Sequence, residues 1–242
     1  MALGELTQAA WGRLLDTDLF YKASTWILPI LIAVTFHEAA HAFAAWRLGD
    51  HTAYRLGRVT FNPLRHIDPV GTVLLPGILF ITGAPFLFGW AKPVPVAFGR
   101  LRHPRRDMAL VAVAGPLTNI VLALVSALLI HAGGLLPVSV APWALQMLYQ
   151  SILLNLVLAV FNMIPLPPLD GSRILMSFLP AVLARQYAKL ERFGFLILIG
   201  VVILLPMLGR QMGMDLYFFR WIIGVPLSWL TPIFLRIAGV PS

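Results

Sequence analysis

The sequence contains no cysteine, so disulfides, zinc sites with cysteine ligands and thiol nucleophiles are all excluded. A bound metal ion would have to use histidine, aspartate, glutamate or water as its ligands. Charged residues are also scarce: they make up 12% of the 242 residues, whereas soluble domains carry about 25%. Hydrophobic residues make up 59%. These proportions predict an integral membrane protein.

The charges are unequal in sign, with 18 Lys and Arg against 10 Asp and Glu, and the net charge is +8. The basic residues lie in loops between apolar runs and not in one block, which membrane orientation alone explains. We therefore expect the lipid bilayer, and no nucleic acid, as a partner. Residues 1–23 lack the basic start and apolar core of a secretory signal peptide, and their pattern predicts a short interfacial helix.

Apolar runs of roughly membrane-spanning length recur along the chain, because a helical span needs about 20 residues. They predict an all-α polytopic membrane protein with about five transmembrane helices, a re-entrant hairpin and short β segments. No repeat or low-complexity linker divides the chain, so we expect one membrane-embedded domain over residues 1–242. The apolar runs are 24–46, 70–90, 108–132, 143–166, 193–209 and 217–239.

The run 70–90 is predicted to re-enter the membrane without crossing it. Two basic loops flank it, at 47–65 and 92–106, and a crossing would put one of them outside, against the positive-inside tendency. Pro76-Gly77 and Gly83-Ala84-Pro85 supply the chain breaks that a hairpin needs. With both basic loops in the cytoplasm, the uncharged loop 133–142 lies on the other side.

Two parts of the basic loops have an extended pattern. Residues 52–61 are rich in Thr, Tyr, Val and Phe, and Asn62-Pro63 ends them with a turn signal. In Lys92-Pro93-Val94-Pro95-Val96 the alternate prolines remove hydrogen-bond donors from one edge only, which suits an edge strand. A polyproline-like loop is the alternative for this second segment.

Metal-capable side chains occur in the first apolar run, as His37-Glu38-x-x-His41. In a helix, two histidines four residues apart face the same side and can bind one zinc ion, with Glu38 beside the metal as a base. A Glu between two His in a membrane-length segment is costly unless it binds something. A coincidental polar patch facing water is the alternative. His41 precedes Arg47 by six residues, or about 9 Å of helix, so the pair lies below the cytoplasmic surface.

Asp170 is the candidate third ligand. No Lys, Arg, Asp or Glu occurs between Asp107 and Asp170, and Asp170 follows the proline-rich end of the run 143–166. By the predicted topology it reaches a depth similar to that of the histidines, from the same side. Taken alone, Asp170 could equally be the N-cap of a following helix. Two His and one Asp would leave a fourth position open, as in catalytic zinc sites.

Several motifs together resemble the site-2 proteases, zinc metalloproteases that cut inside membranes. They cover roughly residues 30–180. The motifs are His37-Glu38-x-x-His41, Gly57-Arg58-Val59-Thr60-x-Asn62-Pro63, His66-Ile67-Asp68-Pro69-x-Gly71-Thr72, Ala114-Gly115-Pro116-x-x-Asn119 and Asn162-x-x-Pro165-x-Pro167-x-Leu169-Asp170-Gly171.

The resemblance implies a core of three helices, a catalytic core at about 24–180, and one Zn²⁺ per chain held by His37, His41 and Asp170. It also implies that Glu38 is the catalytic base. The chain has room for neither the PDZ nor the CBS domain that many relatives carry, so it resembles a minimal member. Its expected substrates are the transmembrane segments of membrane proteins, cut by regulated intramembrane proteolysis near the cytoplasmic side of a prokaryotic plasma membrane.

Further residues are candidates for contact with the substrate. Asn162 and Asn119 could donate to a substrate carbonyl or to the developing oxyanion. For Asn119, a hydrogen bond between helices is an equal alternative. For His66 we favour contact with phosphate headgroups or with Asp68 over a role as a spare ligand. Because a substrate must be unwound to be cut, we expect the segment formed by Lys92, Val94 and Val96 to bind it by strand addition.

Two other classes of protein compete with this interpretation. A membrane transporter or a metal-binding scaffold without protease activity could use the histidine pair for a transiting ion. Such a path would spread ionisable residues along several helices, whereas here they cluster at one depth beside a base. A membrane zinc protease for prenylated or soluble peptides would normally use a glutamate as its third ligand.

Overall fold

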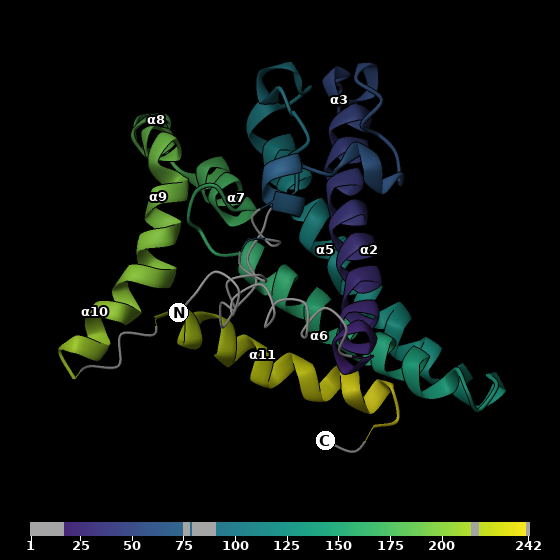
Figure 1. Ribbon diagram of the computed structural model, residues 1–242. Coiled ribbons are helices and arrows are strands. Elements are labelled where there is room, and N and C mark those ends of the chain that lie inside the picture. The colour runs from purple at the N-terminus through teal and green to yellow at the C-terminus, as the bar shows by residue number, and fades with distance from the viewer. Residues whose placement is uncertain (1–16, 75–77, 79–90, 214–217, 241–242) are drawn as a thin grey trace.

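The computed structural model describes residues 17–74, 78, 91–213 and 218–240, and the described part is helical, with no β-strand (Figure 1). The predicted interfacial helix at the N-terminus and most of the run 70–90 therefore lie outside the described residues. The main α-helices are α2 (Thr17–Arg47), α3 (Thr52–Arg55), α5 (Pro104–Ile130), α6 (Ala141–Asn162), α7 (Asp170–Phe178), α8 (Ala181–Ala188), α9 (Gly194–Ile199), α10 (Leu205–Gln211) and α11 (Phe218–Ile237). Short 3-10 or π-helical turns are η1 (Pro63–Arg65), η2 (Pro69–Leu74), η3 (Phe98–Arg100), η4 (His131–Leu135), η5 (Lys189–Phe193) and η6 (Gly200–Leu204).

Three helical stretches in the described part are long and apolar enough to cross a membrane: Ala23–Arg47, Pro104–Leu135 and Ala141–Asn162. They correspond to three of the predicted runs, so the expectation of an all-α membrane protein holds at this level. Proline in the first turn of α5 and α6 suits their starts, because its missing N–H would have no helical partner there. A fourth apolar helix, Trp221–Ile237 within α11, is shorter.

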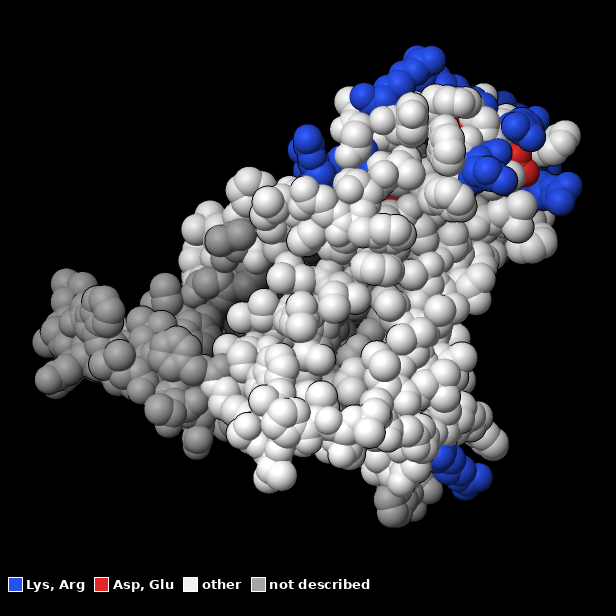
Figure 2. Space-filling view, turned by 90° about the vertical axis from the view of Figure 1, so that its right-hand side faces the viewer, with Lys and Arg blue, Asp and Glu red and all other residues white. Residues whose placement is uncertain are grey.

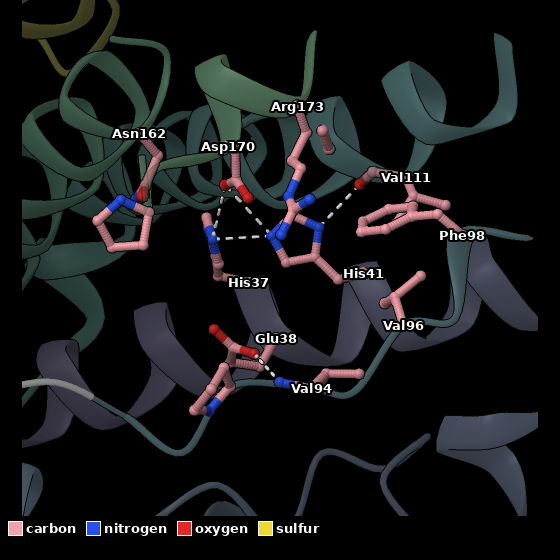
Figure 3. Close-up of a pocket in the computed structure, with 13 residues that line it drawn as sticks. His37, Glu38, His41, Val94, Val96, Phe98, Val111, Asn162, Asp170 and Arg173 are labelled. Carbon is pink, nitrogen blue, oxygen red and sulfur yellow. Dashed lines mark hydrogen bonds and ion pairs between the residues drawn. The ribbon is translucent and has the colours of Figure 1, made fainter. Parts of the chain in front are cut away.

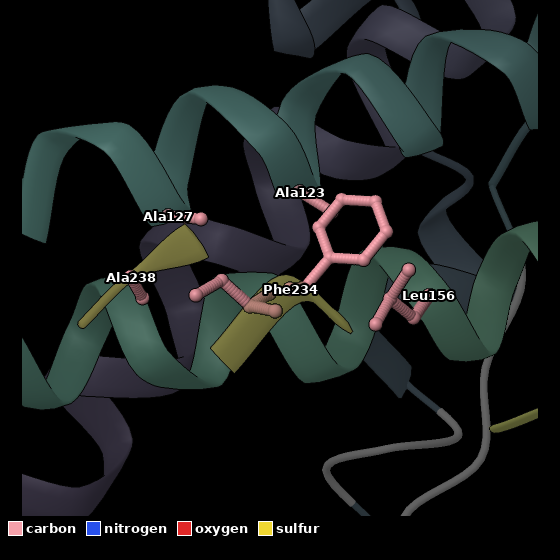
Figure 4. Close-up of a cluster of buried hydrophobic side chains, with 6 residues drawn as sticks. Ala123, Ala127, Leu156, Phe234 and Ala238 are labelled. Carbon is pink, nitrogen blue, oxygen red and sulfur yellow. The ribbon is translucent and has the colours of Figure 1, made fainter. Parts of the chain in front are cut away.

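Small side chains let the long helices pack closely. Ala123 and Ala127 of α5 face Ile152 and Leu156 of α6, and Phe234 and Ala238 at the end of α11 close the cluster (Figure 4). In a membrane the lipid tails are as apolar as the protein, so van der Waals contact between close helices carries much of their association. Ser126 and Ser151 add a hydrogen bond of 2.8 Å between α5 and α6.

Most of the basic residues seen in Figure 2 gather at one end of the molecule, and one lies at the opposite end. At the basic end, the C-terminal end of α2 meets the segment that leads into α5, because the Arg102 N–H donates to the Leu48 carbonyl at 3.0 Å. The Arg100 side chain donates to the Thr52 hydroxyl at 3.2 Å, and the Lys92 N–H donates to the His66 carbonyl at 2.9 Å. The two basic loops therefore lie side by side at the same end.

The predicted strand at 52–61 is wrong, because Thr52–Arg55 forms the helical turn α3. Asp50 explains the difference: its carboxylate accepts hydrogen bonds from the N–H and the hydroxyl of Thr52, which fixes a helix start locally. Burial raises the pKa of Asp50, but hydrogen bonds from Thr52 and Ala97 and the charge of Arg100 lower it by more, so the carboxylate is ionised at neutral pH. These local side-chain hydrogen bonds have overridden the β propensity of the sequence.

The predicted edge strand at Lys92–Val96 is wrong as well, because these residues form a loop without regular secondary structure. Both backbone polar groups of Lys92 are hydrogen-bonded: its N–H donates to the His66 carbonyl, and its carbonyl accepts a hydrogen bond of 2.6 Å from the Arg58 side chain. Farther along, the Ala97 N–H donates to Asp50 at 2.6 Å. Side-chain and loop contacts, and not a sheet, therefore hold residues 92–97 in place.

Candidate active site

Three side chains distant in sequence meet at one point (Figure 3). His37 and His41 project from one face of α2, one turn apart, and both are buried. Asp170 is the first residue of α7 and reaches them from the other side. The two histidine Nε2 atoms are 3.0 Å apart, and Asp170 Oδ2 lies 3.2 Å from His37 Nε2 and 3.3 Å from His41 Nε2. The predicted trio thus forms a compact triangle.

This triangle fits a zinc ion. Tetrahedral ligand atoms about 2.0–2.1 Å from zinc lie about 3.4 Å from one another, close to the three separations found here. In addition, Asp170 Oδ2 is buried and makes no hydrogen bond within the described part of the chain. A buried carboxylate oxygen without a hydrogen bond is costly, and a metal ion between the three atoms would remove that cost.

The remaining ring nitrogens are occupied in the way that metal-binding histidines require. His41 Nδ1 donates to the Val111 carbonyl at 2.7 Å, and His37 Nδ1 donates to Asn119 Oδ1 at 2.7 Å. Both bonds place the proton on Nδ1 and leave the Nε2 lone pair facing the triangle. Asn119 is fully buried, and its own amide donates to Asn155 on α6 at 2.8 Å.

Gly115 lets α5 approach the histidines. A Cβ atom at this position would lie 2.4 Å from His41 Nε2 and 2.7 Å from His37 Nε2. Gly171 has a comparable restriction, because a Cβ there would lie 2.2 Å from the Met163 carbonyl oxygen. Glycine is therefore needed at both positions for close backbone approach.

The structure does not support the alternative role of Asp170 as a helix cap. The helix α7 begins at Asp170 itself, and its N-cap is Leu169, which has no capping side chain. The Asp170 carboxylate instead points toward His37 and His41 (Figure 3).

Glu38 lies beside the triangle and is not one of its members. Its Oε2 accepts a hydrogen bond of 2.8 Å from the Val94 N–H, which brings the extended segment against α2 (Figure 3). A cavity of about 250 Å³ joins these groups, lined among others by the trio, Glu38, Val94, Val96 and Asn162. Asn119 and Lys92 are not among its lining residues.

Asn162 ends α6, as the sequence predicts, and faces the cavity. One of its amide hydrogens goes to the Leu158 carbonyl at 3.0 Å, which leaves the second hydrogen for another partner. The expectation for His66 is wrong: the side chain is buried, and its Nε2 donates to the Thr60 carbonyl at 3.0 Å instead of facing headgroups or Asp68.

Arg173 also lines the cavity, and the sequence interpretation missed it as a site residue. Its guanidinium lies 4.9 Å from the centre of the Phe98 ring and forms an ion pair with Glu191. The signal that could have found it is its place three residues after Asp170, on the same face of a helix.

A membrane helix bundle with a His-Glu-x-x-His helix, an aspartate completing the trio and a cavity beside the glutamate defines a membrane-embedded metallopeptidase. Comparison with known proteins agrees. The family model described as Peptidase family M50 matches residues 137–207. "Putative zinc metalloprotease YwhC" of Bacillus subtilis is 36% identical over 219 residues, which cover 84% of this chain and 96% of the relative. "Putative zinc metalloprotease Rip2" of Mycolicibacterium smegmatis is 31% identical over 195 residues, covering 78% of this chain and 70% of the relative.

The chain belongs to Peptidase family M50, the site-2 proteases. The predictions of the family, of a zinc metalloprotease and of zinc as its cofactor are thereby confirmed. A transporter or scaffold role is not favoured. No solved structure matches the chain.

Proposed function

We propose that this protein hydrolyses peptide bonds within transmembrane segments of membrane proteins, with His37, His41 and Asp170 as zinc ligands and Glu38 as the catalytic base. The observation that carries the proposal is the triangle of buried ligand atoms with Glu38 beside it in one cavity. We treat residues 1–242 as one domain with one zinc ion and a catalytic core at about 24–180.

A zinc ion in this site would supply a Lewis acid that makes a water molecule acidic near neutral pH. Glu38 stands beside the ligand trio, so its carboxylate can take a proton from the attacking water and pass it to the leaving amine. In the described state one oxygen of Glu38 already accepts from the Val94 N–H, which fixes where the carboxylate points. The two carboxylates of Glu38 and Asp170 balance the charge of a divalent ion, which lowers the cost of a charged cluster in a membrane.

The two asparagines are assigned different roles. Asn119 is buried, and its oxygen is bonded to His37, so we assign it to orienting that ligand and not to contact with substrate. Asn162 faces the cavity with one amide hydrogen available, so we assign it to donating to a substrate carbonyl or to the developing oxyanion. Arg173 lines the same cavity, where it contacts Phe98, and it forms an ion pair with Glu191.

We further propose about five membrane-spanning helices, a segment 70–90 that enters and leaves on one side, and a cytoplasm-facing active site in a prokaryotic plasma membrane. The contacts between the two basic loops support this arrangement, because their ends meet at residues on both sides of the segment: Lys92 with His66, and Arg100 with Thr52. The positive-inside tendency then assigns this end to the cytoplasm.

Single cysteines test this topology without background labelling, since the chain has none of its own. We expect Thr52→Cys and Gly99→Cys to react with a membrane-impermeant thiol reagent from the cytoplasmic side in oriented vesicles. Leu135→Cys, which is 88% exposed and lies in the loop between α5 and α6, is the matched control and should react from the opposite side. Labelling of Thr52→Cys and Gly99→Cys from opposite sides would disprove re-entry.

The extended segment is the proposed binding edge for the substrate, with one change from the sequence expectation. The Val94 N–H is occupied by Glu38, whereas the Val96 N–H has no hydrogen bond within the described part. A substrate strand could therefore pair first at Val96, and could pair at Val94 only by displacing Glu38. Pairing would satisfy substrate backbone groups, each of which costs several kcal/mol when left free in a membrane.

Val94→Pro is expected to slow cleavage by about tenfold or more and to leave the zinc content unchanged. The substitution removes the N–H that binds the Glu38 carboxylate, and a hydrogen bond to a charged group contributes about 1.5–3 kcal/mol. Proline already occupies the positions on both sides, Pro93 and Pro95. Val94→Ala, which keeps the N–H, is the control and should remain active. Full activity of Val94→Pro would remove this segment from the mechanism.

Incubation of the purified, zinc-loaded protein with model transmembrane peptides tests the proposed function. Mass spectrometry should locate a single cut near the cytoplasmic end of the peptide. Peptides with Gly or Pro near that position should be cut faster, because helical carbonyls are hydrogen-bonded and shielded by side chains. Zinc binding without any cut, over a panel of such peptides, would favour a scaffold instead.

A further inference from the structure

A second pocket, of about 320 Å³, opens at the basic end of the molecule, away from the ligand trio. Its lining is Trp46, Arg47, His51 and Arg102, and none of these residues lines the active-site cavity. We call it the arginine pocket. Two guanidinium groups at one hollow form a surface suited to an anion, whereas the His51 Nδ1–H already donates to the Gly49 carbonyl at 3.1 Å.

The local fold brings the two arginines together from positions 55 residues apart. The helix α2 ends at Arg47, and the chain turns at Gly49, whose φ of +113° suits glycine. A Cβ at Gly49 would lie only 3.2 Å from Arg102 Cγ, so the arginine stem runs directly over this turn. The hydrogen bond from Arg102 N–H to the Leu48 carbonyl fixes the two segments to each other.

Among the residues that the structure describes, no carboxylate balances the charge of this pocket. Within the described part, the ion pair between an arginine and a carboxylate joins Arg173 to Glu191. The nearby Asp50 is fully buried and directed away, because its oxygens accept from Thr52 and Ala97. Arg47 and Arg102 are both exposed and have no acidic partner among the described residues.

The pocket lies at the depth of lipid headgroups. The first candidate span ends at Arg47, and aromatic rings surround that end, as is typical of membrane–water interfaces. Trp46 stacks on Tyr54 with ring centres 5.3 Å apart, and Phe43, one turn farther into the span, is 51% exposed. The Arg47 guanidinium lies 5.9 Å from the Phe43 ring. A ligand in the pocket could therefore extend an acyl chain along the apolar side of α2.

We propose that the arginine pocket binds the phosphate group of an anionic phospholipid in the cytoplasmic leaflet. Guanidinium groups bind phosphate oxygens through paired hydrogen bonds, and basic pockets beside membrane helices attract anionic headgroups. The aromatic surroundings and the position at the end of the span favour a lipid over a soluble phosphate. The pocket is separate from the ligand trio, so the proposal does not depend on the protease activity, and only its cytoplasmic leaflet rests on the proposed topology.

Native mass spectrometry of the zinc-loaded 242-residue chain in detergent tests the proposal. The protein is titrated with phosphatidylglycerol and, separately, with zwitterionic phosphatidylcholine. We expect one phosphatidylglycerol to bind more tightly than phosphatidylcholine. The double variant Arg47→Gln/Arg102→Gln should bind that lipid at least tenfold more weakly, because each arginine near a charged membrane surface contributes several-fold to binding.

Arg55→Gln/Arg65→Gln is the matched control. It removes two positive charges from the same end, at exposed arginines outside the pocket, and should bind phosphatidylglycerol like the unchanged protein. Equal weakening in both double variants would overturn the proposal in favour of diffuse charge attraction, and no weakening in either would overturn it outright. Displacement of the lipid by millimolar inorganic phosphate would overturn the lipid assignment and indicate a soluble phosphate. Unchanged zinc content and size-exclusion profile verify that each variant is folded.

Discussion

The Glu38→Gln protein is expected to bind one zinc ion per chain and to cut a model transmembrane peptide roughly 10³-fold more slowly than the unchanged protein. General-base catalysis contributes about 10²–10⁴-fold, and glutamine cannot accept the proton. Zinc should stay because Glu38 lies outside the ligand triangle and hydrogen-bonds to Val94 instead. Zinc content by elemental analysis and peptide cleavage by mass spectrometry measure the two effects on one sample.

Variants of the triangle itself should behave in the opposite way. His37→Ala, His41→Ala and Asp170→Ala each remove one of three converging ligand atoms, so each should lose most of the bound zinc together with cleavage. Glu38→Asp is the conservative comparison: it keeps a carboxylate and should retain zinc and part of the activity. Full activity of Glu38→Gln would refute the protease assignment, and zinc retained by all three alanine variants would refute the ligand assignment.

Gly115→Ala is expected to weaken zinc binding by about tenfold or more. The substitution adds a single methyl group, and residue 115 is not itself a proposed ligand. The new Cβ would lie 2.4 Å from His41 Nε2 and 2.7 Å from His37 Nε2, so either α5 or the imidazoles must move. Forcing extra atoms into a packed site costs about 1–3 kcal/mol, and here the displaced groups are the ligands themselves. Titration with a zinc chelator would measure the affinity.

Gly224→Ala provides the matched control for Gly115→Ala. Gly224 also lies within a helix, α11, but a Cβ there meets no atom within 4 Å. It should bind zinc normally, with stability equal or slightly higher, because alanine favours helix. Zinc affinity unchanged in Gly115→Ala would mean that α5 can withdraw from α2 at little cost, and would remove the close approach from our account of the site.

The local patterns of the sequence were sufficient for several features. The period of His37 and His41 puts both rings on one helix face, because side chains four residues apart align in any α-helix. The uncharged runs anticipate the long helices α2, α5 and α6, because spanning a membrane requires internal hydrogen bonding over about 20 residues. The motifs also carried the family resemblance, which the comparisons confirm.

Where the sequence interpretation failed, a contact with a distant residue or a local side-chain hydrogen bond was decisive. Residues 52–61 are rich in β-forming side chains, yet Thr52 hydrogen-bonds to Asp50 and residues 52–55 form a helical turn. His66 reads as an exposed loop residue, but the Thr60 carbonyl and the neighbouring chain bury it. Arg173 lines the cavity because the folded chain places its guanidinium between Phe98 and Glu191, which are distant from it in the sequence.

The sequence by itself therefore determined the membrane-embedded helical class, the histidine pair with its glutamate, and the family. The tertiary structure alone decided which groups surround them: Asp170 at the two Nε2 atoms, Asn119 at His37, Val94 at Glu38, and Arg102 beside Arg47. The physical reason is that periodicity and hydropathy are properties of neighbouring residues, which a helix converts directly into a face. Hydrogen bonds and pockets between segments 55–133 residues apart depend instead on how the helices pack, which no local pattern encodes.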